Sequence, residues 1–311
     1  MKIEKLCYGS YTAKINVSRG GNCISLRNSQ YDCQILREPD YEMGIDNPYV
    51  YGMPVLFPVN RISGGAFEYE NRKYSFPINE EQTNCFLHGM LHELAMEIKE
   101  REEHRIVLLY KATKDTPYLT FPHEFEVWME YSLTDNGLLH EVKIRNLSNE
   151  NMPVLLGFHT TFQIPFIRDS SKEEIVIRAD IAEEYERDKF IHVPTGKILD
   201  YDAISQNLAN GEFVPNIQIS RHYRKGESGI MSITDTKYGI AVVYENCPEF
   251  AYRLIFGQGS DFICLEPQTC IVDCVNSPFP KENTGFIYLE PGNEIKLWSK
   301  IGVNSAMKCA K

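Results

Sequence analysis

The residues with the clearest potential for chemistry are one carboxylate, Glu266, and two histidines, His88 and His159. Glu266 follows a short apolar run at residues 262–265, which has the length of a buried strand, and Pro267 comes directly after it. A carboxylate at the end of a buried strand is costly to desolvate unless something binds it. Glu266 is therefore predicted either to form a structural ion pair or turn contact, or to act on a ligand.

The histidines also have structural and chemical interpretations. His159 lies in the apolar run 154–166, which predicts a strand, and a histidine in such a strand is often a core residue with satisfied hydrogen bonds. His88 and His92 are four residues apart, a spacing that suits a metal pair on a helix. However, the His-Glu-x-x-His pattern is not completed after His92, and Gly89 between the two histidines favours a loop. No metal or other cofactor is expected.

Asn60 and Arg61 are adjacent and come just before a Ser-Gly-Gly turn. A lone arginine is usually a solvated surface charge, but an amide beside a five-donor guanidinium also suits a polyhydroxylated ligand. Nucleotide-binding loops and Ser-His-Asp or Cys-His nucleophiles are missing from the sequence, and a glycoside hydrolase would need a second well-placed carboxylate. The remaining candidates fit general acid–base catalysis on a neutral polar ligand.

The composition limits the classes of binding partner that are expected. The chain has 311 residues, of which 43% are hydrophobic, and its 32 basic and 43 acidic residues give a net charge of −11. This charge argues against nucleic acid or an anionic membrane surface as a partner. The cysteines lack metal-like spacing, and no apolar run approaches a signal or membrane segment. A cytoplasmic protein with reduced thiols is expected.

The elements that must position these residues are predicted to be strands. Alternating or apolar runs, separated by turn residues, occur at residues 11–17, 23–27, 33–36, 66–69, 73–76, 105–112, 125–133, 138–146, 154–166, 229–234, 240–245, 252–256 and 287–301. One short helix is expected at residues 202–208. Sustained helical periodicity, internal repeats and domain linkers are missing. The predicted fold is all-β, a single large antiparallel β-sandwich domain over residues 1–311.

Four motifs, taken together, resemble the aldose 1-epimerase (galactose mutarotase) family. They are Asn60-Arg61-Ile62, Leu87-His88-Gly89, His159-Thr160-Thr161-Phe162 and Glu266-Pro267-Gln268-Thr269, in this order and at similar spacing, within residues 53–298. The resemblance implies a β-supersandwich and the interconversion of α and β anomers of a free aldose without a cofactor. It also implies that Glu266 is the general base and His159 the general acid, and that Asn60, Arg61 and His88 bind the sugar.

One departure from the family pattern leaves the preferred sugar open. Family members commonly place a substrate-binding aspartate before a histidine and an aromatic residue, where this chain has Ser220-Arg221-His222-Tyr223. Two other functions are compatible with the same fold. One is a sugar sensor without catalytic activity, and the other is a mutarotase for hexose phosphates, in which Arg221, Arg224 and Lys225 would form a cationic subsite. A monomer or a homodimer is expected.

Overall fold

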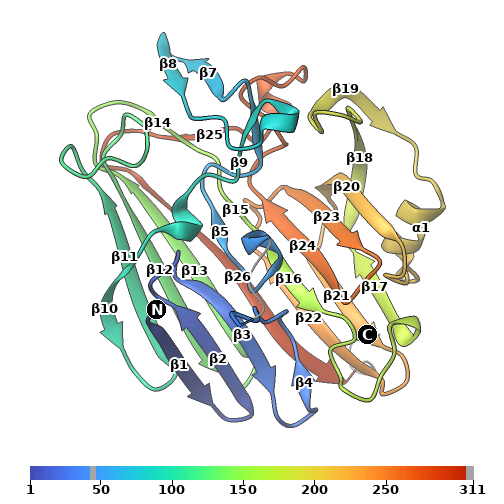
Figure 1. The fold of residues 1–311 in the computed structure, drawn as a ribbon. Coiled ribbons are helices and arrows are strands. Elements are labelled where there is room, and N and C mark those ends of the chain that lie inside the picture. Colours follow the sequence, from blue (N-terminus) through green and yellow to red (C-terminus); the bar gives the residue numbers. More distant parts are fainter. Residues whose placement is uncertain (43–46, 306–311) are drawn as a thin grey trace.

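The computed structural model describes residues 1–42 and 47–305, and two eight-stranded sheets dominate it (Figure 1). The strands of the first sheet, in spatial order, are β10 (Glu97–Arg101), β11 (Arg105–Ala112), β12 (Phe125–Thr134), β13 (Gly137–Asn146), β26 (Glu294–Ser305), β22 (Ile240–Asn246), β21 (Ile230–Asp235) and β17 (Ile175–Ala179). Long alternating strands form this sheet because one of its faces is buried. In β12, for example, buried and partly exposed residues alternate from Phe125 to Leu133.

The second sheet carries the candidate site. Its strands, in spatial order, are β19 (Pro194–Leu199), β18 (Ile181–Arg187), β20 (Gln218–Lys225), β23 (Tyr252–Gln258), β24 (Phe262–Gln268), β15 (Gly157–Phe158) and β5 (Val55–Leu56), and β16 (Thr160–Gln163) also pairs with β24. Strand β24 is buried along its whole length. A side chain on either face of β24 is therefore surrounded by protein, which is the environment that perturbs titratable groups most.

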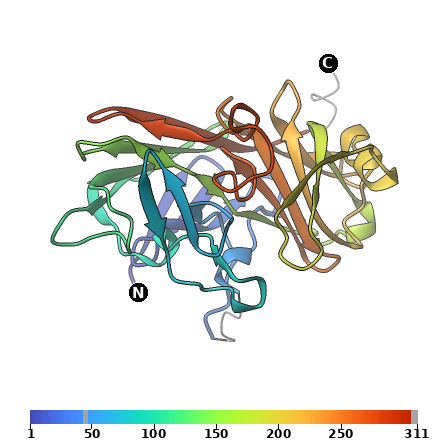
Figure 2. The same ribbon diagram turned by 90° about the horizontal axis from the view of Figure 1, so that it is seen from above.

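Smaller sheets and short helices complete the structure. The sheets are formed by β1 (Ile3–Tyr8), β2 (Tyr11–Asn16), β3 (Asn22–Asn28) and β4 (Cys33–Gln34); by β14 (Met152–Val154) and β25 (Ile287–Leu289); by β6 (Arg61–Ser63) and β9 (Cys85–Leu87); and by β7 (Ala66–Tyr69) and β8 (Arg72–Ser75). The helices are α1 (Ala203–Asn210) and the single 3₁₀ turns η1 (Pro48–Val50), η2 (Glu81–Thr83), η3 (Leu91–Glu93), η4 (Lys172–Glu174) and η5 (Lys281–Asn283). Figures 1 and 2 show α1 at the edge of the molecule beside β18, and the β7–β8 hairpin extending beyond the large sheets.

The all-β prediction is confirmed, since all pairings between the named strands are antiparallel. The expected helix is also present, beginning one residue and ending two residues later than predicted, and Asp202 caps it by accepting hydrogen bonds from the Ile204 and Ser205 amides. Two strand predictions are wrong. The run 154–166 is divided among β14, β15 and β16, and the run 287–301 is divided between β25 and β26 by a turn at residues 290–293.

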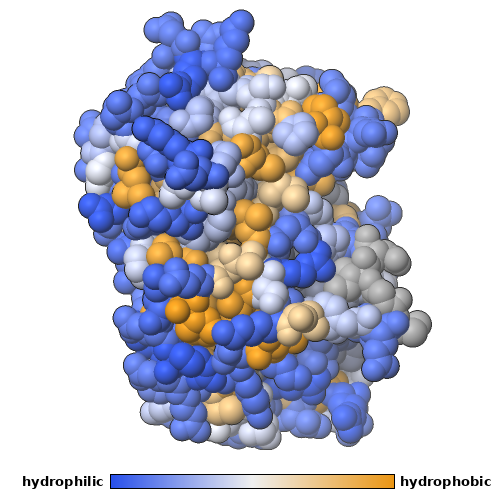
Figure 3. All heavy atoms as spheres, turned by 60° about the vertical axis from the view of Figure 1, so that its left-hand side comes forward, coloured by the Kyte–Doolittle hydropathy of each residue, from blue (hydrophilic) through white to orange (hydrophobic). Residues whose placement is uncertain are grey.

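The molecular surface agrees with the acidic, charge-rich sequence. On the face that Figure 3 shows, hydrophilic groups cover most of the surface and apolar groups gather near its middle. Ion pairs such as Arg105 with Glu130 at 2.7 Å and Arg101 with Glu4 at 3.0 Å link neighbouring strands. No helix within the described ranges is long and apolar enough to cross a membrane.

Candidate active site

Glu266 lies inside β24, and not at its end as the sequence predicts. The strand continues through Pro267 to Gln268, and Glu266 is only 1% exposed. Leu254 of β23 is its cross-strand neighbour. One carboxylate oxygen accepts a hydrogen bond of 3.2 Å from Gln268 Nε2, while Oε1 has no hydrogen-bond partner within the described part of the chain. A buried polar atom without a partner is rare and indicates a place for a ligand or a reaction.

His159 faces Glu266 from the gap between β15 and β16. The strand breaks there because the His159 amide donates to the Pro54 carbonyl at 3.0 Å and leaves the ladder with β24. The His159 ring is 5% exposed, and its Nε2 lies 3.3 Å from Glu266 Oε1. The structure thus brings together the two residues that the family resemblance pairs.

Burial moves the pKa values of this pair in opposite directions. Desolvation raises the pKa of Glu266 to about 8, although Arg187, the Gln268 hydrogen bond and Arg61 oppose this shift. Desolvation also lowers the pKa of His159 to about 3. Each shift disfavours the charged form. At neutral pH the free protein therefore holds one proton in the pair, on the carboxyl group, and a neutral imidazole beside it.

Asn60 and Gln268 hold the carboxyl group from the other side. Asn60 is buried with a positive φ of 59°, and its Nδ2 donates to Gln268 Oε1 at 3.4 Å. Gln268 in turn donates to Glu266. The Asn60 side-chain oxygen accepts from the Arg61 amide at 3.0 Å, which orients the amide group. Gln268 belongs to the Glu-Pro-Gln-Thr motif, but no feature of the sequence showed that it links Asn60 to Glu266.

Arg61 is not a free surface charge. Its Nε and Nη2 atoms donate to the Glu80 carboxylate at 2.6 and 2.7 Å, and the two side chains are only 14% and 11% exposed. Burial opposes ionisation of Glu80, but the hydrogen bonds from Arg61 and Thr83 lower its pKa below the ordinary value. Sequence reasoning missed Glu80 because it is 19 residues from Arg61 and belongs to no recognisable motif.

His88 completes the cluster. Its ring meets the His159 ring edge to face, with centroids 5.4 Å apart, and the Tyr49 ring lies 4.6 Å from it. Burial, followed by the neighbouring His159, lowers the pKa of His88. Tyr49 separates His88 from His92, and the described residues contain no group of three His, Cys, Asp or Glu side chains that could hold a metal. Tyr49 was not predicted from the sequence, and no local pattern indicates it.

Arg221, one of the three residues of the suggested cationic subsite, does not face Glu266. In an antiparallel sheet, paired residues project on the same face and successive residues alternate. His222 pairs with Leu254, which pairs with Glu266, so Arg221 projects on the opposite face. There it forms ion pairs with Glu184 at 2.9 Å and with Asp202 of α1 at 2.6 Å.

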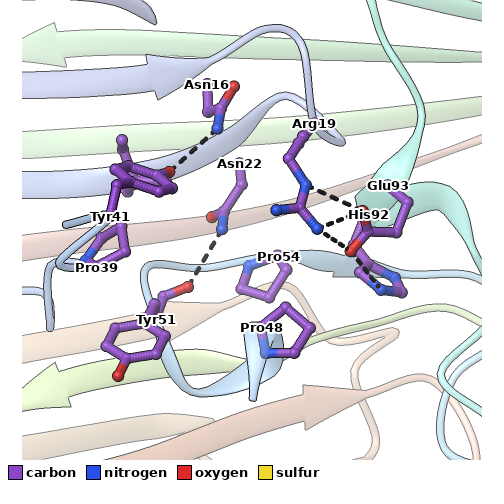
Figure 4. Close-up of a pocket in the computed structure, with 11 residues that line it drawn as sticks. Asn16, Arg19, Asn22, Pro39, Tyr41, Pro48, Tyr51, Pro54, His92 and Glu93 are labelled. Atoms are coloured by element: carbon purple, nitrogen blue, oxygen red, sulfur yellow. Dashed lines mark hydrogen bonds and ion pairs between the residues drawn. The ribbon is translucent and has the colours of Figure 1, made fainter. Parts of the chain in front are cut away.

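A separate pocket lies beside His92 and is not lined by His88 or His159. Figure 4 shows it between the β2–β3 turn, η1 and η3, where Arg19 forms a 2.9 Å hydrogen bond with Glu93 and His92 lies beside them. Its wall also contains Tyr41 and Tyr51. His92 touches Tyr49 on the side of the candidate site, but none of the predicted site residues lines this pocket.

Two antiparallel sheets with a buried carboxyl–histidine pair on one of them define a galactose mutarotase-like protein. The chain belongs to the aldose 1-epimerase family, whose model matches residues 6–302. A galactose mutarotase-like protein from Clostridium acetobutylicum has a similar structure, with a TM-score of 0.91, 28% sequence identity and 98% of both chains covered. The GalM/aldose epimerase homologue from C. elegans shares the fold, with a TM-score of 0.75, 15% identity, and 98% of this chain and 99% of that chain covered. The Escherichia coli K12 protein YphB, whose function is uncharacterised, is 23% identical over 300 residues, which are 94% of this chain and 95% of that protein.

Proposed function

We propose that the chain is an aldose 1-epimerase that interconverts the α and β anomers of a free aldose. The observation that carries this proposal is the buried Glu266–His159 pair, whose facing atoms are 3.3 Å apart. Glu266 Oε1 and His159 Nδ1 are both buried without hydrogen-bond partners among the described residues. Atoms with only a structural role are normally hydrogen-bonded when buried, whereas atoms that exchange protons with a ligand must be free for it.

Anomerisation requires a proton to leave the C1 hydroxyl while another reaches the ring oxygen. The C–O bond to the ring oxygen then breaks, the aldehyde rotates about C1–C2, and the ring closes on its other face. In the proposed mechanism Glu266 accepts the hydroxyl proton and His159 protonates the ring oxygen. Ring closure reverses both transfers, so the pair ends each cycle with the same number of protons.

The resting state of the pair is compatible with these roles. A carboxylate beside an imidazolium carries the same single proton as a carboxylic acid beside a neutral imidazole. Bound sugar hydroxyls would stabilise the ionic form by hydrogen bonds, so the proton can pass from Glu266 to His159 without exchange with solvent. Arg61 would stabilise negative charge on the opening sugar, and Asn60 and His88 would orient its hydroxyl groups.

We also propose a reducing compartment such as the cytoplasm. All the cysteines that the structure describes are free thiols, and all except Cys7 are buried. The alternative of a hexose-phosphate mutarotase loses its main support, because the charge of Arg221 is already balanced by two carboxylates on the other face of the sheet.

The test is the rate of anomer exchange, followed by polarimetry of freshly dissolved α-D-glucose and α-D-galactose. Glu266→Gln keeps the size of the side chain but cannot accept a proton, so kcat should fall by about 10² to 10⁴. His159→Asn should have a similar effect, and the double variant should lose little more, because neither half completes the transfer alone. Sugar binding, measured by calorimetry, should stay within a few-fold.

The chain offers a matched control. Glu102 and His104 also form a carboxylate–histidine pair, at 3.9 Å, but both are exposed, so Glu102→Gln and His104→Asn should leave the rate unchanged. Near-normal exchange by Glu266→Gln would contradict the mechanism. If the unmodified protein binds sugar without exceeding the spontaneous rate, the chain is a sugar sensor instead.

A further inference from the structure

Arg187 lies on the same face of the sheet as Glu266. Its Nη2 donates to the Ser220 carbonyl at 2.6 Å and to the Ser220 hydroxyl at 2.8 Å. Ser220 and His222 are two residues apart on β20, so they project on one face, and His222 pairs through Leu254 to Glu266. The guanidinium of Arg187 therefore extends from β18 across β20 on the face that carries Glu266.

Arg187 is a partly buried cation without a carboxylate partner in the described ranges. It takes part in no ion pair there, although Arg61 has one and Arg221 has two. Burial, followed by the nearby charge of Arg61, lowers the pKa of Arg187 to about 10, while Glu266 acts in the opposite direction. A guanidinium with free donors and no counter-ion, close to a candidate active site, is suited to bind an anion from outside the protein.

The surroundings leave one positive charge unbalanced. Arg61 is neutralised by Glu80, and burial keeps Glu266 protonated near neutral pH, with a pKa of about 8. His192, in the turn between β18 and β19, interacts with Arg61 and Arg187 and also with Glu80 and Asp188. Because the whole chain carries a net charge of −11, an anionic ligand would need such a local cation to bind.

The spacing suits a single sugar ring. The guanidinium rests on β20, and Glu266 lies two strands away, on β24, across β23. Neighbouring strands are about 4.8 Å apart, so roughly 10 Å separate β20 from β24. The Glu266 side chain shortens this gap. Between them, β23 presents Leu254 and Phe256, paired with Glu266 and Cys264, as an apolar floor on which a pyranose ring can lie.

We propose that Arg187 is a substrate-binding residue that selects an aldose with one negative charge at the end away from C1, the simplest being a hexuronic acid. This inference rests on the proposed anomerisation at Glu266 and His159. A carboxylate matches the single unbalanced guanidinium, whereas a dianionic phosphate would require further cations.

The experiment measures anomer exchange by NMR for D-glucuronate, D-galacturonate, D-glucose, D-galactose and D-glucose 6-phosphate. The kcat/KM of the better hexuronate should exceed that of the corresponding hexose at least tenfold. Arg187→Gln should reduce this ratio at least tenfold, and Arg187→Lys, which keeps the charge, should restore part of it. Lys197→Gln removes a positive charge from the neighbouring strand β19, where the side chain is 72% exposed, and should leave the ratio unchanged.

Several results would overturn the inference. Equal losses for acidic and neutral sugars in Arg187→Gln would mean that Arg187 acts only on the ionisation of Glu266. A preference for glucose 6-phosphate would assign the site to dianions, and a preference for neutral hexoses would refute the inference while leaving anomerisation intact. If no sugar is anomerised, the proposed function fails. Calorimetry of hexuronate binding then decides separately, since loss of binding in Arg187→Gln supports the inference and absence of binding to the unmodified protein contradicts it.

Discussion

At the scale of the residue, the main feature is that one cause acts on two groups with opposite results. Burial favours the neutral form of both Glu266 and His159, so the carboxyl group keeps its proton and the imidazole does not take up a second one. Neither group is then poised alone for its proposed role. The pair as a unit is suited to proton transfer, because its two facing atoms can share one titratable proton.

This burial predicts a pH-dependent stability difference between the protein and Glu266→Gln. The pKa of Glu266 is about 8 in the folded state against an ordinary value of 4.5, so the unfolded chain ionises this group first as pH rises. The contribution of Glu266 to stability should therefore fall between pH 4.5 and 8, by about 1.4 kcal/mol per pH unit at most. Glu266→Gln removes this loss, so its advantage in urea unfolding should be larger at pH 8 than at pH 5. A difference that does not change with pH would show that Glu266 is ionised in the folded protein.

Arg61 provides a second prediction at this scale. Arg61→Ala removes a charged hydrogen-bond donor from the proposed sugar site, so kcat/KM should fall, by an amount equivalent to about 1.5–3 kcal/mol of transition-state stabilisation. It also leaves the buried Glu80 without its partner, so the protein should be less stable. Glu80→Gln is the comparison, because it keeps the guanidinium and should reduce kcat/KM less. If Glu80→Gln reduces activity as much as Arg61→Ala, Arg61 acts through the structure that the ion pair holds, and not through direct contact with the sugar.

At the scale of the element, the connections that follow the strands position the site more than the strands do. His88 and Gly89 both have positive φ angles, 62° and 63°, where the chain turns after β9. A Cβ atom on Gly89 would lie 1.9 Å from the Phe57 carbonyl oxygen. This contact is possible only for glycine, and it places the His88 ring against His159.

Gly89→Ala should therefore destabilise the protein and displace His88. Gly64 is the matched control, since its φ is also positive, at 62°, but an added Cβ would meet nothing within 4 Å. We expect Gly89→Ala to cost about 1–3 kcal/mol more than Gly64→Ala in urea unfolding, the usual cost of an overpacked contact, because the two positions share the strain of a positive φ. It should also lower kcat/KM, whereas Gly64→Ala should not. Equal stability losses would mean that backbone strain alone, and not the contact with Phe57, constrains Gly89.

The sequence predicts elements of this kind well where the pattern is local. Alternation identified the long strands of the first sheet, and the short helix expected at residues 202–208 lies within two residues of α1. Two strands near the site were misjudged for physical reasons. Pro267 indicated an ending because it has no amide donor, yet it lies within β24 opposite Arg253. The break at His159 depends on a hydrogen bond to Pro54, more than a hundred residues away, which no local pattern encodes.

The same distinction applies to the site residues. The motifs supplied Glu266, His159, Asn60, Arg61 and His88, and the fold brings them close together or links them through Gln268. Glu80, Tyr49 and Arg187 were missed because their importance arises only from contacts made across the chain. Arg221 was suggested by its charge, but strand alternation places it on the opposite face from Glu266.

At the scale of the whole molecule, pairings between distant segments dominate. Strand β26 lies between β13 and β22 in the middle of the first sheet, and Asn60 reaches Gln268 across 208 residues. Because neither large sheet is built from a continuous part of the chain, we propose that residues 1–311 form one domain that unfolds cooperatively. Calorimetry should give one transition, with equal van't Hoff and calorimetric enthalpies. Two resolved transitions would contradict this proposal.

The central position of β26 has a consequence for the order of assembly during translation. Residues 294–305 are among the last that the structure describes, yet β13 and β22 both need them as a partner. Until this strand leaves the ribosome, the first sheet exists as two halves, each with an unpaired edge. Such edges are templates for pairing with other chains. The nascent protein should therefore depend on chaperones until β26 has been made, and shortened chains that end before β26 should aggregate.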